Sequence, residues 1–332
     1  MPGGPRSPRP LLAAGAALVL CAAAALTALA LWGPQPRPPE LRVMVPNPPG
    51  GGYDTTARAL AEALAAEPGV PGPPEVFNLQ GGAGTAALAR TVHEEGNGRL
   101  LLQMGLGLVA GAQVRGSQYT PADTTPIARL LEEPEVVLVP ADSPYTGFEQ
   151  LAEDWQDPDT VLRLGGGSTR GGPDHLALLL IGEELGLEPG SLGYVRHDGG
   201  GDTLAALLRH EIDVAAAGAG EYRHAIAAGE LRPLAVTGAE RVPGIDAPTL
   251  RELGLDLEFT NWRGLVAPPG IGDARRKELT GMLADMRTSP EWRKALEENH
   301  WTDAYLEGDR FGAFLAEEQE TVDDLLERQG VD

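Results

Sequence analysis

The feature that most constrains the fold is an alternation of strand and helix patterns from residue 41 onward. Short apolar runs, such as LRVMVP at 41–46 and RLLLQMG at 99–105, precede stretches whose apolar residues have helical spacing. Further strands are expected at 135–140 and 160–168. Because each helix returns the chain to the same edge of a sheet, this order is typical of parallel strands. The sequence therefore predicts an α/β fold with mostly parallel sheets flanked by helices.

Four glycine-rich loops stand at the predicted junctions between a strand and the next helix, at 50–52, 81–84, 165–172 and 199–201. In a parallel sheet these junctions share one edge, where free N–H groups and the helix dipole favour a negatively charged group. Glycine also lets a ligand approach the backbone closely. The clearest case is VPNPPGGGYDTTARAL, where two prolines and three glycines directly precede a helix. The loops therefore predict an anion site built from backbone N–H groups.

The same loops lack the residues expected for nucleotide binding or catalysis. A phosphate-binding loop needs a lysine after its glycines, whereas the only lysines are Lys277 and Lys294. Neither HExxH nor GxSxG occurs, and the six histidines lack zinc-ligand spacing. The enzyme alternative is a secreted α/β hydrolase or transferase that pairs Ser168 with His175 or His197. We expect no catalytic residue, no metal and no cofactor.

Length and charge indicate what kind of partner the chain has. Its 332 residues exceed one typical domain, so two lobes are expected. The formal net charge of −22 disfavours nucleic acid and anionic lipid as partners. Because a pocket can differ in sign from the surface around it, an acidic chain remains compatible with an anionic ligand.

Residues 1–40 are expected to form an export signal or membrane anchor followed by a Pro-rich tether. Arg6 and Arg9 precede an apolar run of 22 residues from Leu11 to Trp32. The Ala-Leu-Ala sequence at 28–30 suits cleavage of a signal peptide, but the run is also long enough to span a bilayer. Cys21, the only cysteine, adds lipidation as a third option. All three place the folded part outside the cytoplasmic membrane, in the periplasm or at the cell surface.

Five segments follow one another in the order found in a known family. They are VPNPPGGGYDTTARALAEAL, NLQGGAGTAALART, GGGSTRGGPDHLALLL, GYVRHDGGGDTLAALLRHEIDVAAAG and NWRGLVAPPGI, and they span about residues 41–325. This ordered set resembles the extracytoplasmic solute receptors of tripartite tricarboxylate transporters, the TctC or Bug family. The VRHD sequence at 195–198 departs from a more common Pro-aromatic pairing. Arg196 or His197 could therefore pair with a second ligand carboxylate or face solvent, and the substrate is left open.

The resemblance implies a two-lobed fold like that of type II periplasmic binding proteins, which closes on a small carboxylate such as a tricarboxylate or dicarboxylate. Lobe 1 would comprise residues 41–135 and 240–332, and lobe 2 would comprise 136–239. The expected receptor is a monomer that passes its ligand to a large and a small multi-span membrane subunit. A carboxylate-sensing envelope protein is the alternative.

The resemblance also implies which residues bind the ligand, by their position in the matching motifs. The first loops would contribute the carboxylate seat, and the loops of the other lobe would close over it. The expected ligand-binding residues are Gly50, Gly51, Gly52, Tyr53, Asp54, Thr55, Gln80, Gly81, Gly82, Ala83, Gly84, Met104, Gly105, Ser168, Thr169, His197, Asp198, Gly199 and Gly200.

Overall fold

The structure, a computed structural model, describes residues 41–68, 70 and 72–331. The predicted leader and tether, including Cys21, lie outside these residues. Within the described part of the chain, no helix is both long and apolar enough to cross a membrane.

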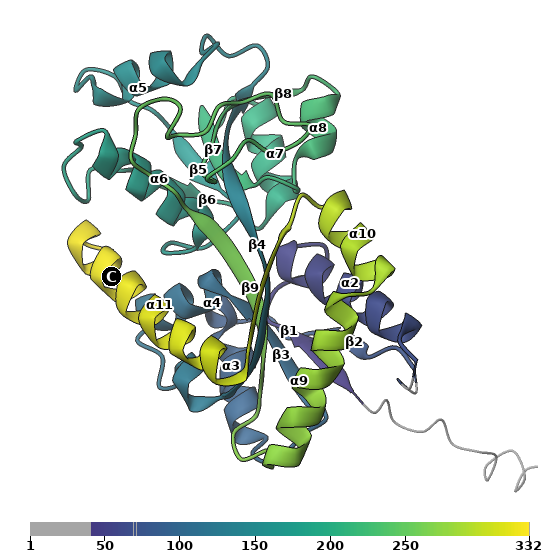
Figure 1. Ribbon diagram of the computed structural model, residues 1–332. Helices are drawn as coiled ribbons and strands as arrows, with labels where there is room; N and C mark the ends of the chain where they lie inside the picture. The colour runs from purple at the N-terminus through teal and green to yellow at the C-terminus, as the bar shows by residue number, and fades with distance from the viewer. Residues whose placement is uncertain (1–40, 69, 71, 332) are drawn as a thin grey trace, which may run out of the picture. The chain divides into compact units, whose positions relative to one another are not determined.

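Strand β4 (Thr125–Pro140) connects two groups of strands (Figure 1). Its first part pairs antiparallel with β9 (Thr260–Ala267) and β10 (Thr302–Glu307). Its last part pairs antiparallel with β7 (Val214–Gly218) and β8 (Leu231–Val236). The full strand order is β2-β1-β3-β9-β4-β7-β5-β6, with β8 and β10 joining at β4. One strand is thus shared by what we call the first half, built on β1 to β3, and the second half, built on β5 to β8.

The first half contains three parallel strands covered by helices on both faces. Alternation along the strands divides the core: Val43 and Val45 pack with α2, α9 and α10, whereas Met44 and Leu102 pack with α3, α4 and α11. The elements are β1 (Arg42–Val45), α2 (Gly52–Ala66), β2 (Glu75–Asn78), the 3-10 turn η1 (Gly82–Gly84), α3 (Thr85–His93), β3 (Leu100–Gly105), α4 (Leu106–Val114), the 3-10 turn η2 (Pro121–Asp123), α9 (Asp273–Arg287), α10 (Pro290–Glu298) and α11 (Gly308–Gln329).

The second half repeats this arrangement with shorter strands. Strand β5 pairs in parallel with both β6 and β7, and apolar side chains of α5 and α6 cover one face of the sheet. The elements are α5 (Phe148–Gln156), β5 (Leu164–Gly166), α6 (Pro173–Glu184), β6 (Tyr194–Arg196), α7 (Gly200–Leu208) and α8 (Arg223–Ala227).

The α/β fold is confirmed, and the connecting strands add an antiparallel component. Strand β9 pairs antiparallel with β3 and with the first part of β4, and β4 pairs antiparallel with its neighbours in both halves. Two boundaries were predicted wrongly. The strand expected at 135–140 begins at Thr125. The strand expected at 160–168 is reduced to β5, because the N–H of Arg163 donates to the Asp213 carboxylate instead of a neighbouring strand.

The partner of β4 changes from β9 to β7 between Pro134 and Glu135. Close by, Thr237 at the end of β8 accepts a hydrogen bond from the N–H of Glu135 at 2.8 Å. The lobe boundaries given above stay a prediction.

Candidate functional site

All four glycine loops lie between a strand and a helix, after β1, β2, β5 and β6. In the first half, the side-chain amide of Asn78 donates to the carbonyl of Asn47 at 2.9 Å and so joins the first two loops. In the second half, the N–H of Gly199 donates to the carbonyl of Gly167 at 3.2 Å and joins the other two. The loops therefore form two contiguous pairs.

The first turn of α2 presents backbone N–H groups that no described side chain caps. Its N-cap is Gly51, which follows two prolines and Gly50, whose φ of 89° lies in the left-handed region. Pro48 and Pro49 are exposed and Gly51 is partly exposed, so this turn is open to solvent. An uncapped helix N-terminus with its dipole is a natural seat for an anion.

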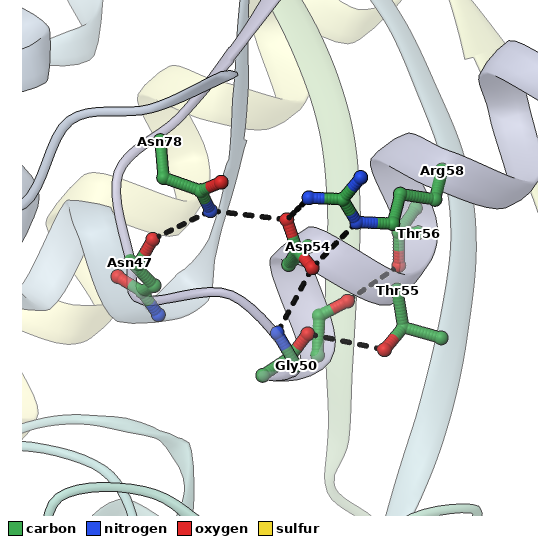
Figure 2. Close-up of polar contacts among 9 residues, drawn as sticks. Asn47, Gly50, Asp54, Thr55, Thr56, Arg58 and Asn78 are labelled. Carbon is green, nitrogen blue, oxygen red and sulfur yellow. Dashed lines mark hydrogen bonds and ion pairs between the residues drawn. The ribbon is translucent and has the colours of Figure 1, made fainter. Parts of the chain in front are cut away.

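The side chain of Asp54 holds the first loop in place through hydrogen bonds (Figure 2). Its carboxylate accepts hydrogen bonds from the N–H of Gly50 at 2.9 Å, from Arg58 at 2.8 and 2.9 Å, and from Asn78 at 3.0 Å. Burial alone would raise its pKa, but the hydrogen bonds and the charge of Arg58 outweigh burial and lower the pKa. The carboxylate is therefore ionised and fully engaged by the chain itself.

A buried arginine that was not predicted lies directly beneath this helix turn. Arg263 of β9 is 4% exposed, donates to the hydroxyl of Thr56 at 3.1 Å and pairs with Glu133. A Cβ added to Gly52 would stand only 2.6 Å from its guanidinium nitrogen Nη2. Glycine at 52 thus lets α2 rest on the guanidinium, and both groups favour an anion above them. The detectable signal was one arginine in the apolar run NWRGLVAPP.

Tyr53 connects α2 with the start of α4. Its hydroxyl accepts a hydrogen bond from the N–H of Leu108 at 3.2 Å, and burial raises its pKa to about 12. A Cβ at Gly107 would lie 3.2 Å from this hydroxyl and 3.3 Å from the ring of Pro173, the first residue of α6. The first turns of α2, α4 and α6 therefore meet around Gly107.

The second loop turns tightly and is mostly open to solvent. Gln80, Gly81 and Gly82 are exposed, and Ala83 has a φ of 57°, which is unusual for a residue with a Cβ. Gly84 is buried, where a Cβ would collide with Leu108.

Two predicted site residues lie away from the solvent-facing loops. Met104 is fully buried in the core beside α4. Gly105 is also buried, and a Cβ there would collide with the carbonyl of Trp262. Thr55, by contrast, is partly exposed and its hydroxyl donates to the carbonyl of Gly51 at 3.2 Å (Figure 2).

In the third loop, Asp174 engages the backbone. Its carboxylate accepts from the N–H groups of Gly167 at 2.7 Å and Ser168 at 3.1 Å. Burial raises the pKa of Asp174, although these hydrogen bonds oppose the rise. The Ser168 hydroxyl accepts in return from the N–H of Asp174 at 3.2 Å, and Thr169 beside it is partly exposed.

The arrangement does not support the Ser–His pair of the enzyme alternative. The ring of His175 accepts from the N–H of Gly171 at 3.0 Å, and burial, helped by the charge of Arg170, lowers its pKa to about 4. Among the described residues, neither His175 nor His197 makes a hydrogen bond with Ser168. The described ranges also contain no group of three His, Cys, Asp or Glu side chains suited to a metal ion.

In the fourth loop, the carboxylate of Glu221 lies against the backbone of Gly200. A Cβ at Gly200 would collide with the carboxylate of Glu221. His197 and Gly199 are partly exposed, and Asp198 is exposed and paired with the exposed Arg196. The structure thus favours the solvent-facing interpretation of Arg196.

A surface hollow of about 220 Å³ lies apart from these four loops. It is lined by the segment after β4, by 160–162, and by His210 and Asp213. The hollow contains none of the predicted ligand-binding residues. We place the candidate site at the loops, because the uncapped α2 turn and the buried Arg263 bear on ligand charge.

A family model and a known relative both match most of this chain. Residues 84–331 match the family model described as the tripartite tricarboxylate transporter family receptor, TctC. A protein of Cupriavidus necator, the UPF0065 protein in the gbd 5' region, is 27% identical over 328 residues, which is 97% of this chain and 95% of that protein.

Two solved structures are similar in fold and sequence. A TctC solute binding protein from Polaromonas, solved without ligand, has a TM-score of 0.67 and 27% identity over 87% of this chain and 98% of its own. MatC from Rhodopseudomonas palustris, solved with bound malate, has a TM-score of 0.74 and 25% identity over 86% of this chain and 98% of its own.

Proposed function

Because the chain belongs to the tripartite tricarboxylate transporter receptor family, we propose that it captures a small carboxylate outside the cytoplasm and delivers it to a membrane transporter. The family and the similar structures are solute-binding receptors, not enzymes. The binding of malate by MatC supports a carboxylate as the class of ligand.

The observation that carries the proposal is the first turn of α2 above Arg263. The helix end leaves its N–H groups uncapped by any described side chain, and the guanidinium lies beneath Gly52. A carboxylate on this turn would accept from backbone N–H groups of Gly51, Gly52 and Tyr53 and gain from the positive charge below. Backbone donors are fixed in place, so little conformational entropy is lost on binding.

The other loops complete the proposed site. Gln80 to Ala83 would border the carboxylate from the second loop, while Ser168, Thr169 and His197 would approach from the second half. The two crossings between the proposed lobes, near Glu133–Val137 on β4 and near Val236–Ala239 at the end of β8, would act as the hinge on which the lobes close. The closed form would be what the large and small membrane subunits recognise.

Calorimetry on the purified protein tests the binding step. Citrate, succinate, glutamate and an aromatic acid would be titrated separately, with a simple sugar as the control for nonspecific heat. We expect saturable binding of at least one carboxylate and none of the sugar. If no carboxylate gives heat or protects the protein against thermal unfolding, the receptor proposal is wrong.

The delivery step needs a separate measurement. Uptake of the identified ligand would be followed in cells that lack this chain and in cells that carry it. A transport receptor predicts that uptake depends on the chain. A chain that binds the ligand but leaves uptake unchanged would instead support the sensor alternative.

A further inference from the structure

Beside Arg263 the chain carries a group of acidic side chains that come from both halves. Glu133, Glu135 and Asp174 are 4%, 0% and 8% exposed, and Glu221 lies within charge-interaction range of them. Arg263 is the cation that acts on this group. Arg263 thus acts on Glu133, Glu135 and Glu221, and Asp174 adds a fourth carboxyl group beside them.

Backbone donors in the second half are already used by the chain itself. Asp174 accepts from the N–H groups of Gly167 and Ser168, and Glu221 lies on the backbone of Gly200. In the first half, no described side chain caps α2, and the guanidinium of Arg263 lies beneath its first turn. The α2 turn is therefore the favoured position for a ligand carboxylate.

Glu221 is the member of the acidic group that is exposed to solvent. Its carboxylate lies against Gly200 in the first turn of α7, where an added Cβ would collide with it. Burial, followed by the charges of Asp174 and Glu133, raises its pKa to about 7. Glu221 is therefore the member of the acidic group that a ligand can contact.

Two buried oxygens beside this group lack hydrogen-bond donors. Glu135 Oε2 and Asn261 Oδ1 have no partner among the described residues, and these side chains are 0% and 8% exposed. The Oε1 atom of Glu135 has only a long contact of 3.4 Å to Asn261. The carboxyl groups here outnumber the one guanidinium, that of Arg263, and this excess of acidic groups favours a ligand group that donates.

From this arrangement we propose that the ligand is an ammonium carboxylate whose carboxylate binds the first turn of α2 and whose ammonium group faces Glu221. This inference rests on the proposed receptor function and narrows its substrate class. A dicarboxylate would place its second charge against Glu221 with Asp174 and Glu133 behind it, where like charges repel. An ammonium group would instead gain a charge-assisted hydrogen bond.

The test compares ligands that differ only at the end that faces Glu221. Calorimetry on the purified protein at about pH 8, where Glu221 is ionised, would use three sets of equal chain length. They are β-alanine, malonate and propionate; γ-aminobutyrate, succinate and butyrate; and δ-aminovalerate, glutarate and valerate. We expect the best ammonium carboxylate to bind about tenfold tighter than its dicarboxylate, a difference of about 1.4 kcal/mol.

Glu221→Gln removes the charge without changing the size of the side chain. The preference for the ammonium ligand should disappear in this variant, and the dicarboxylate should bind more tightly than before. Glu230→Gln is the matched control, because Glu230 is exposed and only its backbone makes a described hydrogen bond. That control should keep the preference.

The outcomes separate the two proposals. A dicarboxylate that binds as tightly as its ammonium counterpart in the unmodified protein would overturn this inference and leave the receptor function intact. Equal ligand preference in Glu221→Gln and Glu230→Gln would also overturn it. Absence of binding by every carboxylate would overturn the receptor proposal and this inference together. The ligand comparison in the unmodified protein does not depend on whether either variant folds.

Discussion

The guanidinium of Arg263 lies so close to Gly52 that a Cβ on residue 52 would stand 2.6 Å from Nη2. The two residues come from β9 and from the first turn of α2. Arg263 is fixed in place by Thr56 and Glu133, and Glu133 also accepts from the indole N–H of Trp301 at 2.9 Å. A helix N-terminus therefore rests directly on a buried cation that is paired with Glu133.

Gly52→Ala should destabilise the protein. The methyl group would press on a guanidinium that its partners hold in place, so we expect the free energy of unfolding to fall by about 1–3 kcal/mol. Denaturant unfolding measures this. Gly51→Ala is the control, because its backbone has a φ of −78° and a Cβ there meets only the carbonyl of Pro48 at 3.8 Å. Equal stability of the two variants would contradict the packing described here.

Arg263→Gln should weaken both folding and carboxylate binding. Removing one member of a buried ion pair leaves Glu133 unpaired, which costs about 3–5 kcal/mol of stability. The double variant Arg263→Gln with Glu133→Gln should recover part of that stability, because no unpaired charge remains. Carboxylate affinity should stay at least about tenfold weaker in both, since the cation below α2 is absent.

The exposed Arg310 offers a control for the change in net charge. Arg310→Gln should leave stability and affinity unchanged. Calorimetry that shows normal carboxylate affinity in the double variant would mean that Arg263 only supports the fold. The comparison of the single and double variants therefore separates the structural role of the guanidinium from its role in binding.

Ala83→Gly should stabilise the protein. Ala83 has a φ of 57°, a conformation that costs a residue with a Cβ about 1 kcal/mol relative to glycine. Relief of that cost should raise the midpoint of thermal unfolding. The same substitution at Ala89, inside α3, should have the opposite sign and cost about 1 kcal/mol. A loss of stability in Ala83→Gly would show that the loop does not adopt this turn in solution.

Local sequence patterns predicted where the loops lie between strands and helices. Glycines, apolar runs and helix-start residues are signals that span only a few positions, so they can be read from the sequence alone. The positions of Gly51, Gly82 and Gly199 at strand-to-helix junctions follow from such signals. The contact of Gly52 with Arg263 joins residues far apart in the chain, and no local pattern encodes it. Nor does the sequence around Glu221 indicate that its carboxylate reaches Gly200.

The role predicted for the backbone N–H groups stays a prediction. To these groups the structure adds a buried guanidinium, that of Arg263, beneath the first turn of α2. The carboxylate of Asp54, a predicted ligand-binding residue, accepts hydrogen bonds from Gly50, Arg58 and Asn78 (Figure 2). Contacts between side chains that are distant in the sequence decide which loop N–H groups are left for a ligand.

Binding of an ammonium carboxylate should strengthen as pH rises through about 7. The groups that act on Glu221 are Asp174 on α6, Glu133 on β4, Arg263 on β9 and the backbone of Gly200 on α7, and burial is the largest influence. Its pKa of about 7 exceeds the ordinary 4.5, so the folded protein holds this proton more tightly than the unfolded chain does. Protonated Glu221 has no charge to offer an ammonium group. The association constant measured by calorimetry should therefore rise up to about tenfold between about pH 6 and pH 8.

The proton on Glu221 also affects the free energy of unfolding, which should fall as pH rises, whereas ligand affinity should increase. Because the folded state retains the proton of Glu221 above the pKa of the unfolded chain, its contribution to stability should decrease from about pH 4.5 to pH 7 and then stay constant. Glu221→Gln should bind the ammonium ligand weakly and without this pH dependence, whereas Glu230→Gln should retain it. A rise of affinity with pH that persists unchanged in Glu221→Gln would assign the titration to another group.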